Sequence, residues 1–112
     1  MGDCIFCKIV DGTARADVLH RDELVTVFRD LRPAAPTHIL IVPNRHIDSV
    51  DQLEEADASL VGHMFVVAKQ IAAREALSDG YRLIVNTGPQ GGQTVFHLHL
   101  HLIGGHPMRA MG

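Results

Sequence analysis

Three histidines alternate with aliphatic residues in the segment 96–102, which reads Phe-His-Leu-His-Leu-His-Leu. A period of two is typical of a half-buried strand, so His97, His99 and His101 are predicted to project from one face, roughly 6.5 Å apart. Imidazole titrates near neutral pH and acts as nucleophile, acid, base or metal ligand. A row of three aligned imidazoles therefore indicates a chemical site.

Cys4 and Cys7 form a second pattern with chemical meaning. The C-x-x-C spacing is typical of a zinc site, but two cysteines make only half of a tetrahedral set. A redox motif would need a preceding strand in a βαβ unit, and only three residues precede Cys4. Two small buried side chains are the remaining alternative.

The rest of the chain predicts an α+β fold that positions these residues. A short helix is predicted over 4–12, where Gly12 ends it, and a long one over 56–76, where apolar residues recur at spacings of three and four. The segment 78–80, Ser-Asp-Gly, is predicted to terminate the long helix. Four segments precede the triad strand as further strands, in chain order 18–20, 24–28, 38–42 and 81–86. The third of these is near-continuously apolar and hence central, and Pro43 ends it.

Length and composition restrict the function. The 112 residues predict a single domain. With a net charge of −3, the chain has no basic stripe for a phosphate backbone, which argues against a nucleic-acid polymer as ligand. A single nucleotide needs only a few local donors. No apolar run approaches the ~20 residues of a membrane helix, and no secretory signal is recognisable. We therefore expect a cytoplasmic protein with reduced cysteines and no membrane partner.

Two longer motifs carry a resemblance to a known family. The segments 30–38, Asp-Leu-Arg-Pro-Ala-Ala-Pro-Thr-His, and 91–97, Gly-Gly-Gln-Thr-Val-Phe-His, together with the H-x-H-x-H row, resemble the histidine triad (HIT) family. Within it the Hint branch, the histidine triad nucleotide-binding proteins, is most similar. The resemblance implies one HIT domain over 1–112, with a five-stranded antiparallel sheet, one long and one short helix. It also implies a homodimer whose two sheets join into a continuous ten-stranded sheet.

The resemblance also implies roles for individual residues. His99 would be the nucleophile, with His101, His38 and Thr94 completing the catalytic set. Asp30 would pair with the ribose hydroxyls, and Asn86 and Gln93 would donate to phosphate oxygens. The remaining substrate-binding residues would be Phe28 and Leu31. The residues themselves leave alternatives open: His38 as a core histidine, Asn86 as a strand-end residue and Asp30 as the start of a turn before Pro33.

The family resemblance completes the metal-like pattern as well. Relatives with the N-terminal cysteine pair bind structural zinc through it, together with residues that correspond here to His46 and His97. A set of Cys4, Cys7, His46 and His97 would attach the first helix to the sheet. No organic cofactor is expected. The sequence departs from the family in Ala14-Arg15-Ala16, which replaces an Ile-Pro-rich stretch, and in a short tail without Trp.

The function implied is hydrolysis of nucleoside 5′-phosphoramidates, such as adenylated amines or lysine, and of acyl-adenylates. The reaction would release AMP through a nucleotidyl-histidine intermediate, with purine nucleotides (AMP, GMP) as the nucleotide part. One alternative is a dinucleoside polyphosphate hydrolase of the same family, although Gly-Gly-Gln-Thr before the triad favours the first assignment. The other is a nucleotide-binding regulatory module whose hydrolysis is incidental.

Overall fold

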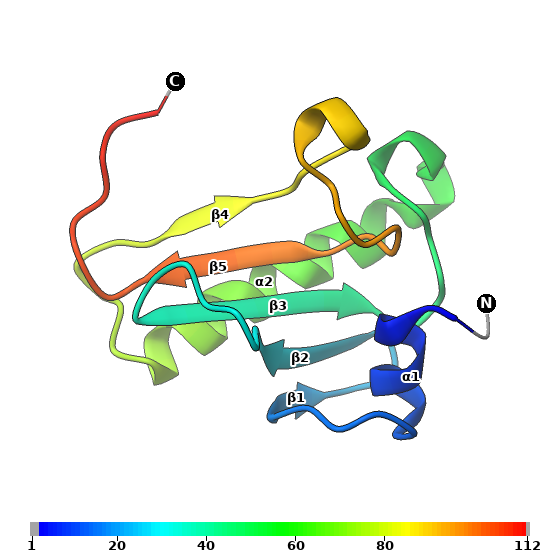
Figure 1. Cartoon of the computed structure of the whole chain (residues 1–112), viewed down its shortest axis with the longest axis horizontal. Helices are drawn as coiled ribbons and strands as arrows, with labels where there is room; N and C mark the ends of the chain where they lie inside the picture. The colour runs from blue at the N-terminus through cyan, green and yellow to red at the C-terminus, as the bar shows by residue number, and fades with distance from the viewer. Residues whose placement is uncertain (1–2, 112) are drawn as a thin grey trace.

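The computed structural model describes residues 3–111 as one antiparallel sheet with a helix on each face. Its helices are α1 (Ile5–Asp11) and α2 (Ala58–Arg74). Its strands are β1 (Val18–Arg21), β2 (Val25–Arg29), β3 (Thr37–Pro43), β4 (Arg82–Ile84) and β5 (Leu100–Gly104). Three short 3₁₀ turns lie at Val50–Gln52, Glu55–Asp57 and Pro89–Gly91. The predicted α+β class, with five strands, one long and one short helix, is confirmed (Figure 1).

The strand order is β1-β2-β3-β5-β4, and each neighbouring pair is antiparallel. The apolar strand β3 is central, as predicted, and lies between β2 and the triad strand β5. In this register Leu40 is opposite His101, and His38 is opposite Ile103. Since alternate residues share a face, His38 and His101 are diagonal neighbours on the same side of the sheet.

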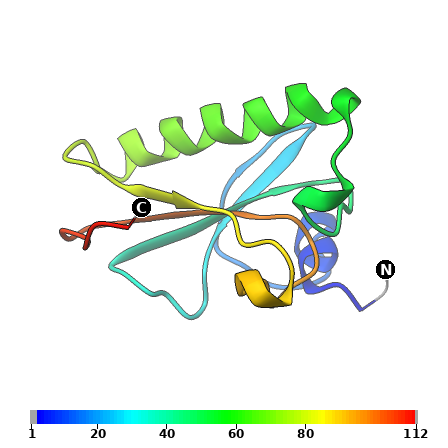
Figure 2. The same cartoon turned by 90° about the horizontal axis from the view of Figure 1, so that it is seen from above.

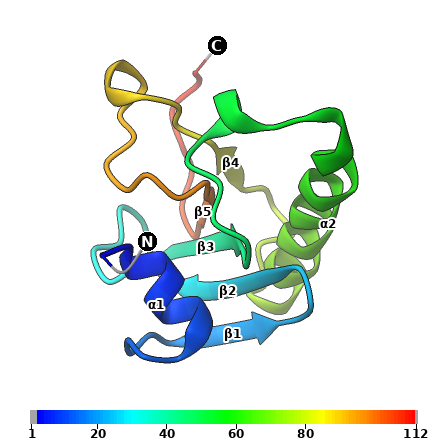
Figure 3. The same ribbon diagram turned by 90° about the vertical axis from the view of Figure 1, so that its right-hand side faces the viewer.

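The two faces of the sheet have different partners. Val25, Val27, Ile39, Leu100 and Leu102 pack with the buried stripe of α2 in the main core. On the other face, Phe28, Leu40 and Val42 pack with Phe6 and Ile9 of α1. Figures 2 and 3 show α1 and α2 on opposite sides of the sheet. Because α1 is short, it covers only part of its face and leaves room there for a site.

The ends of both helices have identifiable causes. Cys4 is the N-cap of α1, where its Sγ accepts from the Cys7 N–H at 3.4 Å, and Gly12 ends the helix with a φ of 86°. The long helix ends before the predicted Ser-Asp-Gly segment. Ala76, with a φ of 59°, takes the left-handed position of a Schellman motif, in which the Leu77 N–H donates to the Ala72 carbonyl at 3.0 Å. Leu77 thereby turns into the core.

The described part of the chain, residues 3–111, contains no helix with the length and hydrophobicity needed to span a bilayer.

Candidate functional site

A cavity of about 540 Å³ opens on the α1 side of the sheet, a volume within the range of ligand sites. Phe28 and Leu40 line it from the sheet, and Phe6 and Ile9 line it from α1. The predicted site residues that line the cavity are Phe28, Asp30, Leu31, Thr94, His99 and His101. One wall is thus apolar, and the other carries imidazoles, a hydroxyl and a carboxylate.

His99 is held in one tautomer. Its Nδ1 lies 2.7 Å from the main-chain oxygen of His97, and a carbonyl oxygen only accepts, so Nδ1 carries the proton. The ring of Phe6 stands edge-on to the His99 ring, with centroids 5.1 Å apart and planes at 87°. Burial lowers the pKa of His99. The side chain is therefore neutral at pH 7, with the lone pair on Nε2, as a nucleophile requires.

His101 forms a pair with His38 beside the cavity. The His38 Nε2 lies 2.8 Å from the His101 Nδ1 and 3.4 Å from the Asp30 Oδ2, and the ligand atoms of all three lie within 4.8 Å of one another. Burial, reinforced by the neighbouring His99 and His38, lowers the pKa of His101 to about 4. Within residues 3–111, its Nε2 is buried without a hydrogen-bond partner. Such an atom is a candidate contact for a substrate oxygen.

Cys4, Cys7, His46 and His97 form a second cluster at the start of α1, with ligand atoms within 4.8 Å of one another. The Cys7 Sγ lies 3.2 Å from the His46 Nδ1 and 3.6 Å from the His97 Nδ1, and the Cys4 Sγ lies 3.4 Å from the His97 Nδ1. In a tetrahedral zinc site the S···N separation is roughly 3.5 Å, given Zn–S and Zn–N bonds of about 2.3 and 2.0 Å. The geometry therefore fits zinc.

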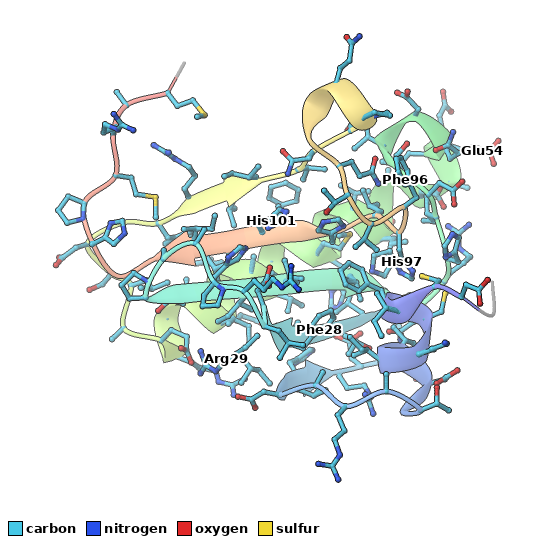
Figure 4. The ribbon with its side chains drawn as sticks, in the orientation of Figure 1. Phe28, Arg29, Glu54, Phe96, His97 and His101 are labelled. Carbon is cyan, nitrogen blue, oxygen red and sulfur yellow. The ribbon has the colours of Figure 1, made fainter. Side chains whose placement is uncertain are left out.

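The outer hydrogen bonds of this cluster fit a metal site as well. The His46 Nε2 lies 2.6 Å from an oxygen of Asp48, and the His97 Nε2 lies 2.8 Å from the Pro43 carbonyl. Both partners place the proton on Nε2 and leave the Nδ1 lone pair for a metal, as is usual for metal-binding histidines. Burial lowers the pKa of His97, which also favours the neutral ligand form. Figure 4 shows His97 near the start of α1, away from His101 on β5.

Two predicted phosphate donors lie outside the cavity lining. Gln93 is buried, and its Nε2 donates to the carbonyls of Asp48 and Val95 at 2.7 and 3.1 Å, while its Oε1 accepts from the Gly88 N–H. Both amide hydrogens thus hold the loop that precedes the triad. Asn86 follows β4 and is partly buried. Their role as phosphate donors stays a prediction.

The predicted triad strand is longer than the observed one. His97 and His99 precede β5, which begins at Leu100, so only His101 lies on the strand. Pro43 ends β3 opposite this point and has no N–H to continue the ladder, and the Leu98 N–H donates instead to the Ile47 carbonyl at 2.7 Å. The alternation of faces survives: Leu98, Leu100 and Leu102 enter the main core.

Some residues that contact or hydrogen-bond the site histidines were not predicted from the sequence. Asp48 is one, and the spacing His46-x-Asp48 on an extended segment is a signal for it. Phe6 is another, and its position between Cys4 and Cys7 placed it next to the metal cluster. The Pro43 and His97 carbonyls carry no sequence signal, because main-chain groups are common to all residues.

Comparisons with known proteins agree with this geometry. A family model described as "Scavenger mRNA decapping enzyme C-term binding" matches residues 3–112. A purine nucleoside phosphoramidase of Escherichia coli K12 is 46% identical over 110 residues, covering 97% of this chain and 92% of that protein. A HIT family hydrolase from Legionella pneumophila has a TM-score of 0.94 and 44% identity, with 96% of both chains covered. A zinc-bound histidine triad family protein from Mycobacterium smegmatis has a TM-score of 0.82 and 34% identity, covering 92% of this chain and 75% of that one.

Proposed function

This chain belongs to the histidine triad family of hydrolases, and on that basis we propose that it hydrolyses purine nucleoside 5′-phosphoramidates through a nucleotidyl-His99 intermediate. The observation that carries the proposal is the state of His99, whose Nδ1 is tied to the His97 carbonyl inside a cavity of nucleotide size. A neutral imidazole with a fixed tautomer, beside a second imidazole and a hydroxyl, suits attack on phosphorus.

The reaction would take two steps. In the first, the Nε2 lone pair of His99 forms a bond to phosphorus, the P–N bond to the leaving amine breaks, and the amine takes one proton from solvent as it departs. In the second, a water oxygen bonds to phosphorus, the P–Nε2 bond breaks to release AMP, and the attacking water gives one proton back to solvent. His101 and Thr94 line the same cavity, and we propose that they stabilise charge on the phosphate oxygens. Histidine and water suffice for both steps, so we propose no organic cofactor.

The apolar wall and Asp30 support nucleoside binding. Phe28 forms an edge contact with Phe6 at 5.4 Å, and together they offer aromatic surface to a purine base. Leu31, at the cavity mouth, is 86% exposed and would be covered by a bound base. One carboxylate oxygen of Asp30 accepts from the Arg32 N–H at 2.8 Å, and the carboxylate lines the cavity, where the ribose hydroxyls of AMP or GMP would donate to it.

We propose that the cluster of Cys4, Cys7, His46 and His97 holds one structural zinc ion. The zinc-bound relative from Mycobacterium smegmatis and the fit of the donor set support this assignment. Zinc bound there would link the start of α1 to His46, in the loop after β3, and to His97, two residues before His99. Its contribution is to the stability of the fold, and no catalytic step passes through it.

We also propose that two chains pair through β4 into a continuous ten-stranded sheet. β4 ends the strand order, so one of its edges has no strand partner in the described chain. Phe65 and Val66 of α2 and Tyr81 before β4 are exposed, at 43%, 53% and 40%. Sedimentation at micromolar concentration should give a mass near twice 12.2 kDa, and a monomer mass would contradict this proposal.

A hydrolysis panel tests the proposed activity against its alternatives. AMP-amides, GMP-amides, acyl-adenylates and diadenosine polyphosphates are compared at equal concentration by kcat/KM. We expect the amides to be hydrolysed best, with acyl-adenylates also accepted. Preference for diadenosine polyphosphates would assign the chain to the other hydrolase class. Tight AMP binding with negligible turnover on all four would favour a regulatory module.

A further inference from the structure

His38 receives a hydrogen bond from the main chain of its own loop. The Ala34 N–H lies 2.9 Å from the His38 Nδ1. A backbone N–H only donates, so Nδ1 must accept and must carry no proton. A proton on Nδ1 would set one N–H against the N–H of Ala34, donor against donor. The contact therefore places the ring proton of His38 on Nε2.

The tautomer of His38 determines the tautomer of His101. The His38 Nε2, which carries the proton, lies 2.8 Å from the His101 Nδ1, which must therefore accept. A neutral His101 then keeps its own proton on Nε2, the buried atom without a partner among residues 3–111. Within the proposed function, on which the inference rests, we infer that the Ala34 backbone N–H is a positioning group that fixes both tautomers, so that His101 presents an N–H to the substrate phosphate.

The loop that carries Ala34 is held firmly. The Asp30 N–H donates to the His38 carbonyl at 2.9 Å, which closes the loop between β2 and β3. Pro33 and Pro36 restrict the backbone on either side of Ala34. Pro36 packs against Gly105 after β5, where an added Cβ would come within 2.8 Å of the proline Cβ. The Ala34 N–H is thus fixed relative to both strands that carry the imidazole pair.

The tautomer of His101 affects the first step of the reaction. A phosphate oxygen that approaches the His101 Nε2 meets a hydrogen-bond donor. In the opposite tautomer it would meet a lone pair and be repelled. Loss of one such donor typically costs about 10²–10³ in kcat. Ala34 touches no reacting atom and acts only through His38 and His101.

Nitrogen-15 NMR of the parent protein, labelled at histidine, tests the tautomers directly and without substrate. At pH 7 we expect the His38 and His101 signals to show a protonated Nε2 and an unprotonated Nδ1, with His38 Nδ1 coupled to the Ala34 amide proton. A protonated Nδ1 on either ring would overturn the inference. This measurement requires no variant to fold.

A pair of proline variants tests the consequence. Ala34→Pro removes the N–H that donates to His38, whereas Ala35→Pro removes a neighbouring N–H that makes no hydrogen bond within residues 3–111. We expect Ala34→Pro to lower kcat about 100-fold, with a smaller change in KM and with mixed tautomers in the nitrogen-15 spectrum. Ala35→Pro should keep the parent tautomers and a kcat within a few-fold of the parent.

The outcomes separate this inference from the proposed function. Parent tautomers retained in folded Ala34→Pro would refute the positioning role, as would an unchanged kcat. If the parent shows the expected tautomers but hydrolyses no member of the substrate panel, the proposed function fails while the tautomer assignment stands. If Ala34→Pro does not fold, the parent spectrum decides the assignment.

Discussion

Lowering the pH should destabilise the fold through His101 in particular. Its pKa is near 6.5 in an unfolded chain and about 4 in the folded protein, because the site is buried and adjoins two further imidazoles. Between these values the unfolded chain binds a proton that the folded protein does not. The free energy of unfolding therefore falls as the pH drops from 6.5 toward 4, and His101 contributes no further change outside this window.

The magnitude follows from the two pKa values. The full shift corresponds to about 3 kcal/mol, and between pH 7 and pH 5 the loss is about 2 kcal/mol. Urea unfolding at pH 7, 6 and 5 measures it, by comparison of the parent with His101→Gln, which keeps a polar side chain but does not titrate. The other titrating groups are common to both proteins, so the difference between the two pH dependences isolates residue 101.

His106 provides the control, because it lies exposed in the C-terminal tail. His106→Gln should lose stability with falling pH as the parent does, whereas His101→Gln should lose about 2 kcal/mol less between pH 7 and pH 5. Identical pH dependence in all three proteins would refute the claim that His101 is held neutral by burial.

Three further perturbations have defined outcomes. If Cys4, Cys7, His46 and His97 bind zinc, the purified protein should contain about one zinc per chain, and Cys4→Ser should lower its melting temperature while sparing most of kcat. Full stability in a zinc-free protein would contradict this assignment. Asp30→Ala should abolish the preference for ribose over 2′-deoxyribose in the nucleotide, because the carboxylate that 2′-deoxyribose would leave unpaired is gone. An unchanged preference would show that Asp30 does not bind the ribose. Ala76→Gly should raise the free energy of unfolding by about 1 kcal/mol, because Ala76 has a φ of 59°, whereas Ala73→Gly in the same helix should lower it by about 1 kcal/mol. Equal effects of the two glycines would exclude the backbone explanation.

The elements of the fold could largely be predicted from local patterns. The apolar run of β3 and the three-and-four spacing of α2 each determine an element whose type and place are confirmed. The boundaries that differ depend on groups distant in the sequence. β5 starts at Leu100 because the Leu98 N–H pairs with the Ile47 carbonyl, and α2 ends at Arg74 where Leu77 turns into the core beside Gly104. Ile47 and Gly104 lie far along the chain from the residues that they contact.

The candidate site was predictable where side chains carry the chemistry. The spacing of the imidazoles indicated a site, and the family resemblance supplied Asp30 and His46, which the structure brings to the cavity and to the metal-like cluster. Gln93 shows the limit, since its amide hydrogens are committed to Asp48 and Val95, a fact set by the path of a loop. The main-chain donors and acceptors that fix the imidazole tautomers are equally invisible in the sequence.

The most direct test of the account is a search for the covalent intermediate on His99. Parent protein is mixed with a radiolabelled AMP-amide, quenched within milliseconds and digested under basic conditions, and the labelled peptide is sequenced. We predict an acid-labile, base-stable phosphoramidate on the peptide that contains His99. We also predict that His99→Ala still binds AMP but loses many powers of ten in kcat, beyond the about 10²–10⁴-fold cost of losing a general acid or base. Label on another histidine, or percent-level turnover by His99→Ala, would contradict the account.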